Sequence, residues 1–167
     1  MIVNLIGPPG AGKSTFASRF VLEHPHFTLC DIAGYRAESS TEKEAWERLE
    51  RDVALNRDVV LETCGLNYQL KGIFRKNKDR HVFTVLIVGE PKELRKRIRE
   101  RRRKRIPPFK YRLRDELNTV EWVMDHLDET PIAPELIVNT VSGNSEDDYS
   151  YITNAIIRRR LLVGYKP

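Results

Sequence analysis

The stretch Gly7-Pro8-Pro9-Gly10-Ala11-Gly12-Lys13-Ser14 fits the pattern G-x-x-x-x-G-K-[ST] at every defined position. Glycines allow successive backbone N–H groups to turn toward one point, where they can wrap phosphate oxygens at the start of a helix. An apolar run at 2–6 precedes the motif and a helical pattern at 14–23 follows it. This strand, loop and helix context predicts a phosphate-binding loop rather than a chance glycine-rich turn.

Two side chains of this loop have defined chemical roles. Lys13 supplies a mobile positive charge for the β- and γ-phosphates of a nucleotide, and the Ser14 hydroxyl suits Mg²⁺. The predicted nucleotide-binding residues of the loop are Gly7, Pro8, Pro9, Gly10, Ala11, Gly12, Lys13, Ser14 and Thr15. The loop alone therefore predicts a bound nucleotide and Mg²⁺; that the nucleotide is ATP is implied by the resemblance described below.

Length and composition favour one globular domain spanning residues 1–167. The chain of 167 residues is 40% hydrophobic and 32% charged, which is typical of a soluble protein with a proper core. No apolar run approaches the roughly 20 residues of a membrane span, and the apolar N-terminal segment continues directly into the phosphate loop. We therefore expect a cytoplasmic protein without membrane contact, in which Cys30 and Cys64 are reduced core thiols.

The basic charge of the chain is concentrated in one segment. The net charge is +5, but residues 92–105 hold ten Lys or Arg and two Glu, a local charge of +8, which leaves −3 elsewhere. Like charges at such density repel one another without a counter-anion. The pattern therefore indicates a polyanionic ligand at one place.

The remaining periodicity predicts alternating strands and helices. Strands are expected at 2–6, 27–31, 58–63, 81–88 and 135–139, and helices at 14–23, 41–56, 67–77, 91–105, 113–128 and 145–162. Gly34 is expected to place Tyr35 and Arg36 in a loop, and Trp46 and Trp122 fall on apolar helical faces that we assign to the core. This order predicts an α/β domain with a mostly parallel five-stranded sheet flanked by helices.

Ligands of such sheets bind at the edge formed by the carboxyl ends of the strands. Four features are expected at this edge, because each follows or ends a predicted strand: the phosphate loop, Asp31, Glu62 and Thr140. The chain has no Asn-Lys-x-Asp segment for reading guanine, and the layout is typical of small phosphotransferases. Asp31 is a candidate to accept or orient the proton of an attacking hydroxyl. Glu62 is a candidate to bind Mg²⁺ through a water or to hold the acceptor.

Beyond the phosphate loop, several features resemble the phage-type polynucleotide 5′-kinases and their small P-loop relatives over about residues 1–115. They are the acid before Tyr35-Arg36, the series Glu93-Leu94-x-x-Arg97-x-x-x-Arg101, and Pro107 and Arg112. The resemblance implies a P-loop kinase domain in which residues of about 92–112 form an arginine-rich lid over the phosphates. Arg97 and Arg101 would belong to that lid.

The same resemblance implies roles on the substrate side. Arg36 would contact a phosphate of the substrate nucleic acid, with Tyr35 beside it, and Arg112 would act there or in the lid. The turn 140–144 would border the adenine, beginning with Thr140. Two departures concern the acceptor: three residues separate Asp31 from Tyr35, and the third strand ends in Glu62-Thr63 rather than Asp-Thr.

Three functions fit these residues. The leading hypothesis is transfer of the γ-phosphate of ATP to a hydroxyl of nucleic acid, at a 5′ end of DNA or RNA or at a hydroxymethylated base such as 5-hydroxymethyluracil in phage DNA. The concentrated basic segment supports it, because Lys and Arg contacts to phosphates dominate nucleic-acid affinity. The second is a kinase of a nucleoside, nucleotide or other small metabolite. The third is an ATP-dependent switch that binds nucleic acid without phosphorylating it.

Overall fold

Strand β1, Ile2–Ile6, runs through the middle of the sheet, and all five of its residues are buried. The computed structural model describes residues 1–104, 112–140 and 146–164. Within these ranges five parallel strands are arranged in the order β2-β3-β1-β4-β5. The other strands are β2 Thr28–Asp31, β3 Val59–Glu62, β4 Val82–Val88 and β5 Leu136–Asn139. The predicted parallel α/β sheet is confirmed, because each apolar run forms a strand.

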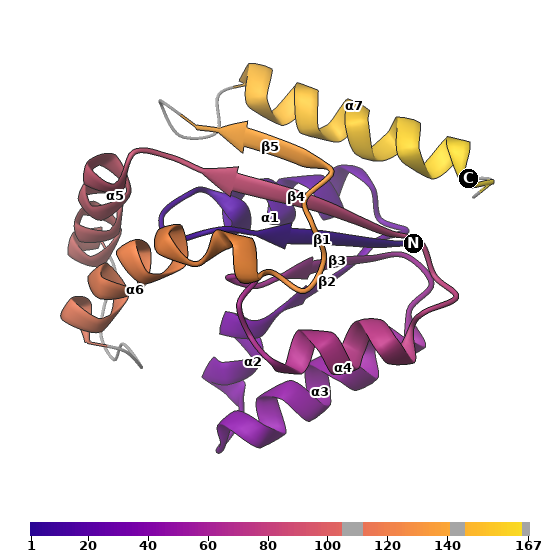
Figure 1. The fold of residues 1–167 in the computed structure, drawn as a ribbon, viewed down its shortest axis with the longest axis horizontal. Helices are drawn as coiled ribbons and strands as arrows, with labels where there is room; N and C mark the ends of the chain where they lie inside the picture. Colours follow the sequence, from indigo (N-terminus) through magenta and orange to yellow (C-terminus); the bar gives the residue numbers. More distant parts are fainter. Residues whose placement is uncertain (105–111, 141–145, 165–167) are drawn as a thin grey trace.

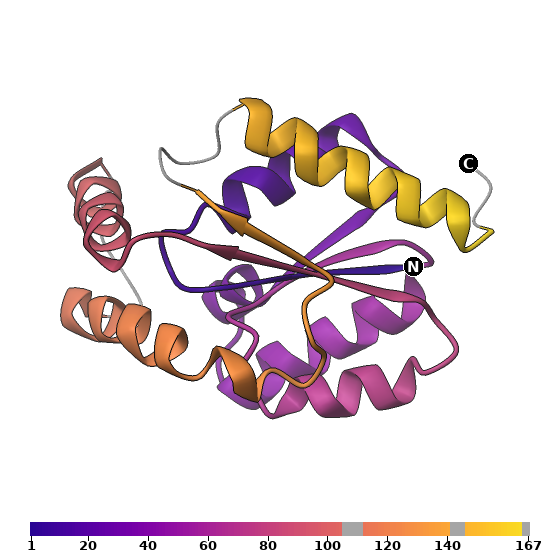
Figure 2. The same ribbon diagram turned by 45° about the horizontal axis from the view of Figure 1, so that its top comes forward.

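Helices cover both faces of this sheet (Figures 1 and 2). In the described ranges the helices are α1 Lys13–Glu23, α2 Ile32–Glu38, α3 Glu42–Leu55, α4 Gln69–Lys76, α5 Pro91–Lys104, α6 Leu113–Asp125, the 3₁₀ turn η1 Leu127–Glu129 and α7 Glu146–Leu162. Helices α1 and α7 lie on one face, and α3 and α4 lie on the other. Helix α5 stands beyond the carboxyl end of β4, beside α6.

Alternating residues of β1 enter two separate cores. Val3 and Leu5 pack in the cluster that contains Phe16 and Phe20 of α1 and Ile152 of α7. Ile2 packs in the cluster formed with α3 and α4. A strand buried on both faces needs apolar residues at consecutive positions, which explains the uninterrupted run at 2–6. None of the helices in the described ranges has the length and apolar character needed to cross a bilayer.

The segment after β2 differs from the prediction, because Tyr35 and Arg36 lie in α2 rather than in a loop. Asp31 is the N-cap of this helix, and its carboxylate accepts hydrogen bonds from the N–H groups of Ala33 and Gly34 at 2.9 and 3.0 Å. An N-cap carboxylate satisfies amide groups that have no partner in the first turn. This capping starts the helix despite the low helix propensity of Gly34.

Two further boundaries differ from the sequence-based expectation. Helix α6 ends at Asp125, and η1 follows where a continuous helix to 128 was expected. Trp46 is buried as predicted, but Trp122 is 48% exposed and stacks on His126 with ring centroids 5.2 Å apart. Helix α6 buries only the narrow stripe of Val120 and Val123, so its apolar face does not extend to Trp122. The expected helix end at 106–108 and the turn at 143–144 lie outside the described residues.

Candidate active site

The loop between β1 and α1 adopts a backbone that only glycine accommodates at its key positions. Gly7, Gly10 and Gly12 have φ values of 138°, 82° and 99°. A Cβ atom at Gly7 would lie 2.0 Å from the backbone oxygen of Ile87, and one at Gly10 would lie 2.7 Å from that of Leu94. Gly12 is the N-cap of α1, so the loop delivers the amino end of that helix to the carboxyl edge of the sheet. This is the geometry of an anion-binding loop.

Lys13, the first residue of α1, is buried over the loop that precedes it. Its Nζ donates hydrogen bonds to the carbonyl oxygens of Gly7 at 2.9 Å and Pro8 at 3.0 Å. Burial lowers the pKa of the Lys13 ammonium, and the nearby carboxylate of Glu62 acts against that shift. The positive charge of Lys13 is thus held inside the curve of the loop, where a phosphate would be bound.

Glu62 at the end of β3 connects the sheet to the first turn of α1. The Ser14 hydroxyl donates a hydrogen bond to Glu62 Oε1 at 2.6 Å. Glu62 is 5% exposed, and its second oxygen is buried without a hydrogen-bond partner in the structure. Burial raises the pKa of the Glu62 carboxyl, although the charge of Lys13 opposes this. A buried carboxylate oxygen beside a serine hydroxyl provides the hard oxygen ligands that Mg²⁺ prefers.

A metal at this place would not be held by protein alone. The described part of the chain contains no group of three or more His, Cys, Asp or Glu side chains that could hold a metal ion. Mg²⁺ in nucleotide sites keeps several waters and uses one or two protein oxygens together with the phosphates. The orphaned oxygen of Glu62 and the hydroxyl of Ser14 fit such a partial ligand set.

Asp31 lies next to Glu62, because β2 and β3 pair in register with Asp31 opposite Glu62. The charges of Asp31 and Glu62 both act to raise the pKa of Lys13, which indicates that the three groups share one site. The Asp31 carboxylate is also the cap of α2, so its two oxygens already accept backbone N–H groups. The structure therefore brings together Lys13, Ser14, Asp31 and Glu62, as the sequence predicted.

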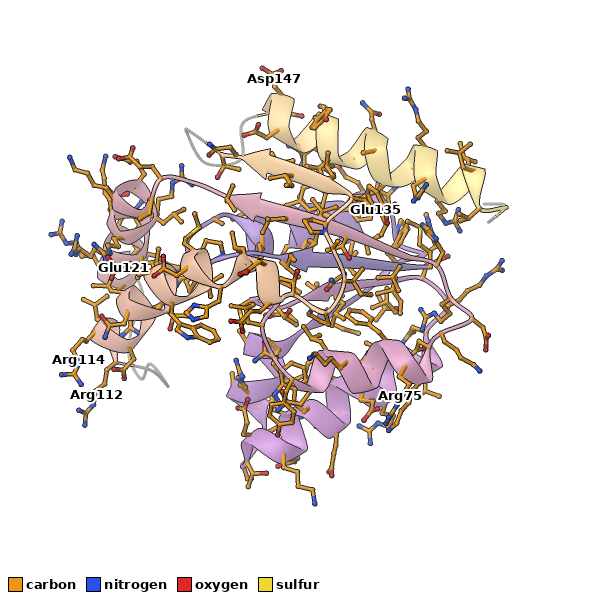
Figure 3. The ribbon with its side chains drawn as sticks, viewed as in Figure 1. Arg75, Arg112, Arg114, Glu121, Glu135 and Asp147 are labelled. Atoms are coloured by element: carbon orange, nitrogen blue, oxygen red, sulfur yellow. The ribbon has the colours of Figure 1, made fainter. Side chains whose placement is uncertain are left out.

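Tyr35 and Arg36, the other predicted substrate contacts, are engaged with α3. The Tyr35 hydroxyl donates to Asp52 Oδ2 at 2.6 Å, and Arg36 Nε donates to the carboxylate of Glu42 at 2.9 and 3.0 Å. These contacts hold α2 against α3. Arg112 is the N-cap residue of α6 and points away from the sheet (Figure 3). The structure thus does not bring Arg112 to the cluster around Lys13.

Arg97 of α5 is bound to the phosphate loop and to the end of β5. Its guanidinium donates a hydrogen bond to the Gly10 carbonyl oxygen at 3.5 Å. It also donates to two atoms of Thr140, the hydroxyl oxygen Oγ1 at 3.3 Å and the carbonyl oxygen at 3.2 Å. The Thr140 hydroxyl lies 3.2 Å from the Ala11 carbonyl oxygen and 3.1 Å from that of Val88. Arg97 and Thr140 together fix the outer side of the loop. The rest of the predicted adenine-bordering turn, 141–144, lies outside the described residues.

The acidic side chains of α6 neutralise part of the basic segment, which sequence reasoning missed. Arg102 Nε donates to Glu116 Oε2 at 3.0 Å, and Arg101 binds Glu116 Oε1. Arg95 forms an ion pair with Glu121, which lies on α6 beside α5 (Figure 3). Glu116 and Glu121 could have been noticed as acids following a basic helix, but only the apolar spacing of α6 entered the prediction.

Comparison with known proteins shows the fold. No protein-family model matches the chain, and no curated protein matches it. Shikimate kinase from Bacteroides thetaiotaomicron has a similar structure, with 17% identity, coverage of 98% of each chain and a TM-score of 0.63. YorR from Bacillus subtilis, in complex with phosphorylated GDP, has 17% identity over 100% of this chain and 99% of its own, with a TM-score of 0.65.

Kti12 from Chaetomium thermophilum, in complex with ADP-AlF3, gives 15% identity over 95% of this chain and 98% of its own, with a TM-score of 0.65. At these identities the likeness concerns architecture. The chain shares its single-domain α/β fold with shikimate kinase and Kti12. These comparisons do not show the resemblance to phage-type polynucleotide kinases.

Proposed function

We propose that this chain is an ATP- and Mg²⁺-dependent kinase that transfers the γ-phosphate to a hydroxyl group. The observation that carries the proposal is the hydrogen bond of 2.6 Å between Ser14 and Glu62, which joins the phosphate loop to the acidic edge of the sheet. Two of the similar structures hold a nucleotide, ADP-AlF3 in Kti12 and phosphorylated GDP in YorR. Both support nucleotide binding on this fold.

In the proposed reaction, each step is assigned to particular residues of the site. Lys13 and the amides of the loop bind the phosphates, and Ser14 and Glu62 hold Mg²⁺, which neutralises phosphate charge when bound. The acceptor oxygen forms a bond to the γ-phosphorus as the bond to the bridging oxygen breaks, and ADP leaves with that electron pair. Asp31 accepts the hydroxyl proton, and Arg101 neutralises charge on the transferred group.

For the acceptor, we favour a hydroxyl of nucleic acid because a basic stripe lies along the exposed side of α5. Lys92, Lys96, Arg99 and Arg103 are all exposed, and their spacing places them on one face of the helix. We name these four residues the exposed basic stripe. Four cations along one helix face match the repeating charge of a phosphate backbone. The hydroxyl would belong to a 5′ end or to a hydroxymethylated base.

A small-molecule acceptor is the second candidate, and a specific observation favours it. Arg95, Arg101 and Arg102 are ion-paired with α6, so much of the positive charge of α5 is neutralised within the chain. In that case the arginines serve the nucleotide alone. Shikimate kinase, a similar structure, is named for a small metabolite acceptor. An ATP-dependent switch without transfer is the remaining alternative.

One experiment separates these candidates. The chain is incubated with ATP labelled in its γ-phosphate and with one acceptor at a time, and the label transferred to the acceptor is measured. The acceptors are 5′-hydroxyl DNA and RNA, DNA containing 5-hydroxymethyluracil, nucleosides, nucleoside monophosphates and shikimate. The Lys13→Ala variant is the blank. Label on a polymer that is lost with the blank and weakens steeply with added salt supports the nucleic-acid acceptor. Label confined to small molecules supports the second candidate. ATP binding without label on any acceptor would contradict the kinase proposal.

A further inference from the structure

Glu116 of α6 holds two neighbouring arginines of α5 with its two oxygens. Oε2 accepts from Arg102 at 3.0 Å, and Oε1 pairs with Arg101. The side chains of Glu116 and Arg102 are only 18% and 15% exposed, whereas Glu121 in the neighbouring Arg95 pair is 57% exposed. Ion pairs that are partly shielded from solvent are screened less than fully exposed ones. Glu116 is therefore the firmer of these two links between α5 and α6.

Arg101 also acts electrostatically on groups of the phosphate site. Its positive charge acts to lower the pKa values of Lys13 and Glu62, which places it within electrostatic reach of both. Arg101 lies one helical turn after Arg97, which contacts the phosphate loop itself. An arginine side chain has several rotatable bonds, so a free one would lose conformational entropy each time it met a phosphate. An arginine already held by a carboxylate loses less.

We propose that Glu116 is a positioning residue that holds the Arg101 guanidinium in place for the transferring phosphoryl group, with Arg102 anchoring Glu116 from the opposite oxygen. The inference rests on the proposed kinase function. Guanidinium groups carry five N–H donors in a planar fork, so Arg101 can keep its carboxylate while it donates to a phosphate. Glu116 thus acts on the reaction only through Arg101.

The test is a double-mutant cycle of Glu116→Gln and Arg101→Ala, with Glu121→Gln as the matched control. Glu121→Gln removes the same charge from the same helix pair but acts on Arg95. We expect Glu116→Gln to lower kcat for γ-phosphate transfer about tenfold without raising the KM for ATP. The reason is that the Arg101 guanidinium, once displaced, no longer stabilises the charge of the transition state. In the Arg101→Ala background the same change should have no further effect. Thermal unfolding of each variant reports on the fold.

Several outcomes would overturn the inference. An equal loss with Glu121→Gln would show that general packing of α5 on α6 is responsible, and an undiminished loss in the Arg101→Ala background would show that Glu116 acts by another route. A rise in kcat with Glu116→Gln would mean that the carboxylate restrains Arg101 instead of positioning it. Absence of transfer from the wild-type chain would overturn the proposed function as well, whereas active wild type with unchanged Glu116→Gln would overturn this inference alone.

Discussion

Ser14 at the start of α1 and Glu62 at the end of β3 are joined by a hydrogen bond of 2.6 Å, although 48 residues separate them in the chain. Parallel strands place their carboxyl ends at one edge, so the phosphate loop after β1 meets the acidic end of its neighbour β3. The second oxygen of Glu62 is buried without a partner in the structure. A buried polar atom without a partner is costly, which a metal ion or its water would relieve.

Glu62→Gln should therefore weaken the use of Mg²⁺. The amide keeps the volume and one oxygen for Ser14, but it removes the negative charge. We expect the Mg²⁺ concentration needed for half-maximal transfer to rise about 10- to 100-fold. The measurement is a Mg²⁺ titration of initial rates, with the exposed Glu129→Gln as control. An unchanged Mg²⁺ requirement would remove Glu62 from the metal site.

Asp31 carries two roles that different substitutions can separate. Asp31→Asn keeps an N-cap acceptor for α2, whereas Asp31→Ala loses it and should lower the free energy of unfolding by about 1 kcal/mol. If Asp31 accepts the hydroxyl proton, both variants should lose transfer by about 10²- to 10⁴-fold. Steady-state kinetics and urea unfolding of both variants check this. Activity retained by Asp31→Asn and lost only with Asp31→Ala would leave Asp31 as a cap alone.

The parts of this site that residues close together in the chain determine could be predicted from the sequence, and most of the parts that distant residues determine could not. The phosphate loop is local: its glycines, Lys13 and the flanking strand and helix are adjacent in the chain, so their pattern was sufficient. The alignment of Asp31 with Glu62 could also be predicted, because parallel strands end at a common edge.

The parts that were missed depend on tertiary packing. The pairing of Glu116 with Arg101 and Arg102 requires α6 to fold back along α5, and no periodicity within either helix contains that information. Trp122 has the spacing of a core residue, but it is 48% exposed, because α6 buries only Val120 and Val123. The helix containing Tyr35 depends on the capping of α2 by Asp31, which outweighed the signal of Gly34 to break the segment.

The backbone of the phosphate loop makes a prediction that contrasts two glycines. Gly7→Ala places a Cβ atom 2.0 Å from the Ile87 carbonyl oxygen at a φ of 138°, so it should destabilise the fold by at least about 2 kcal/mol and abolish ATP binding. A Cβ atom at Gly72 in α4 would meet open space among the described residues outside its own helix, so Gly72→Ala should stabilise the fold by about 0.5–1 kcal/mol. Urea unfolding and nucleotide titration measure both. Normal ATP binding by Gly7→Ala would show that the loop tolerates another backbone.

Far from the active site, Asp58 and Arg160 form a buried ion pair between the start of β3 and α7. Arg160 donates to Asp58 Oδ2 at 3.0 Å, and the side chains are 8% and 4% exposed for Arg160 and Asp58. Burial acts to raise the pKa of Asp58, but hydrogen bonds from the α-amino group of Met1 and from Arg160 outweigh burial and lower it. The folded state thus favours the ionised carboxylate.

The pKa of Asp58 in the folded state lies below its ordinary value of 3.8. The ionised carboxylate therefore stabilises the fold fully above pH 3.8, and this stabilisation is lost as the pH falls through the pKa of the folded state. Asp58→Asn leaves Arg160 buried without its counter-charge, so it should lower the free energy of unfolding at pH 7 by about 3 kcal/mol. The difference between variant and wild type should shrink at pH 3 or below. Urea unfolding at both pH values, with the exposed Asp128→Asn as control, measures it. An equal difference at both pH values would assign the effect to packing instead of charge.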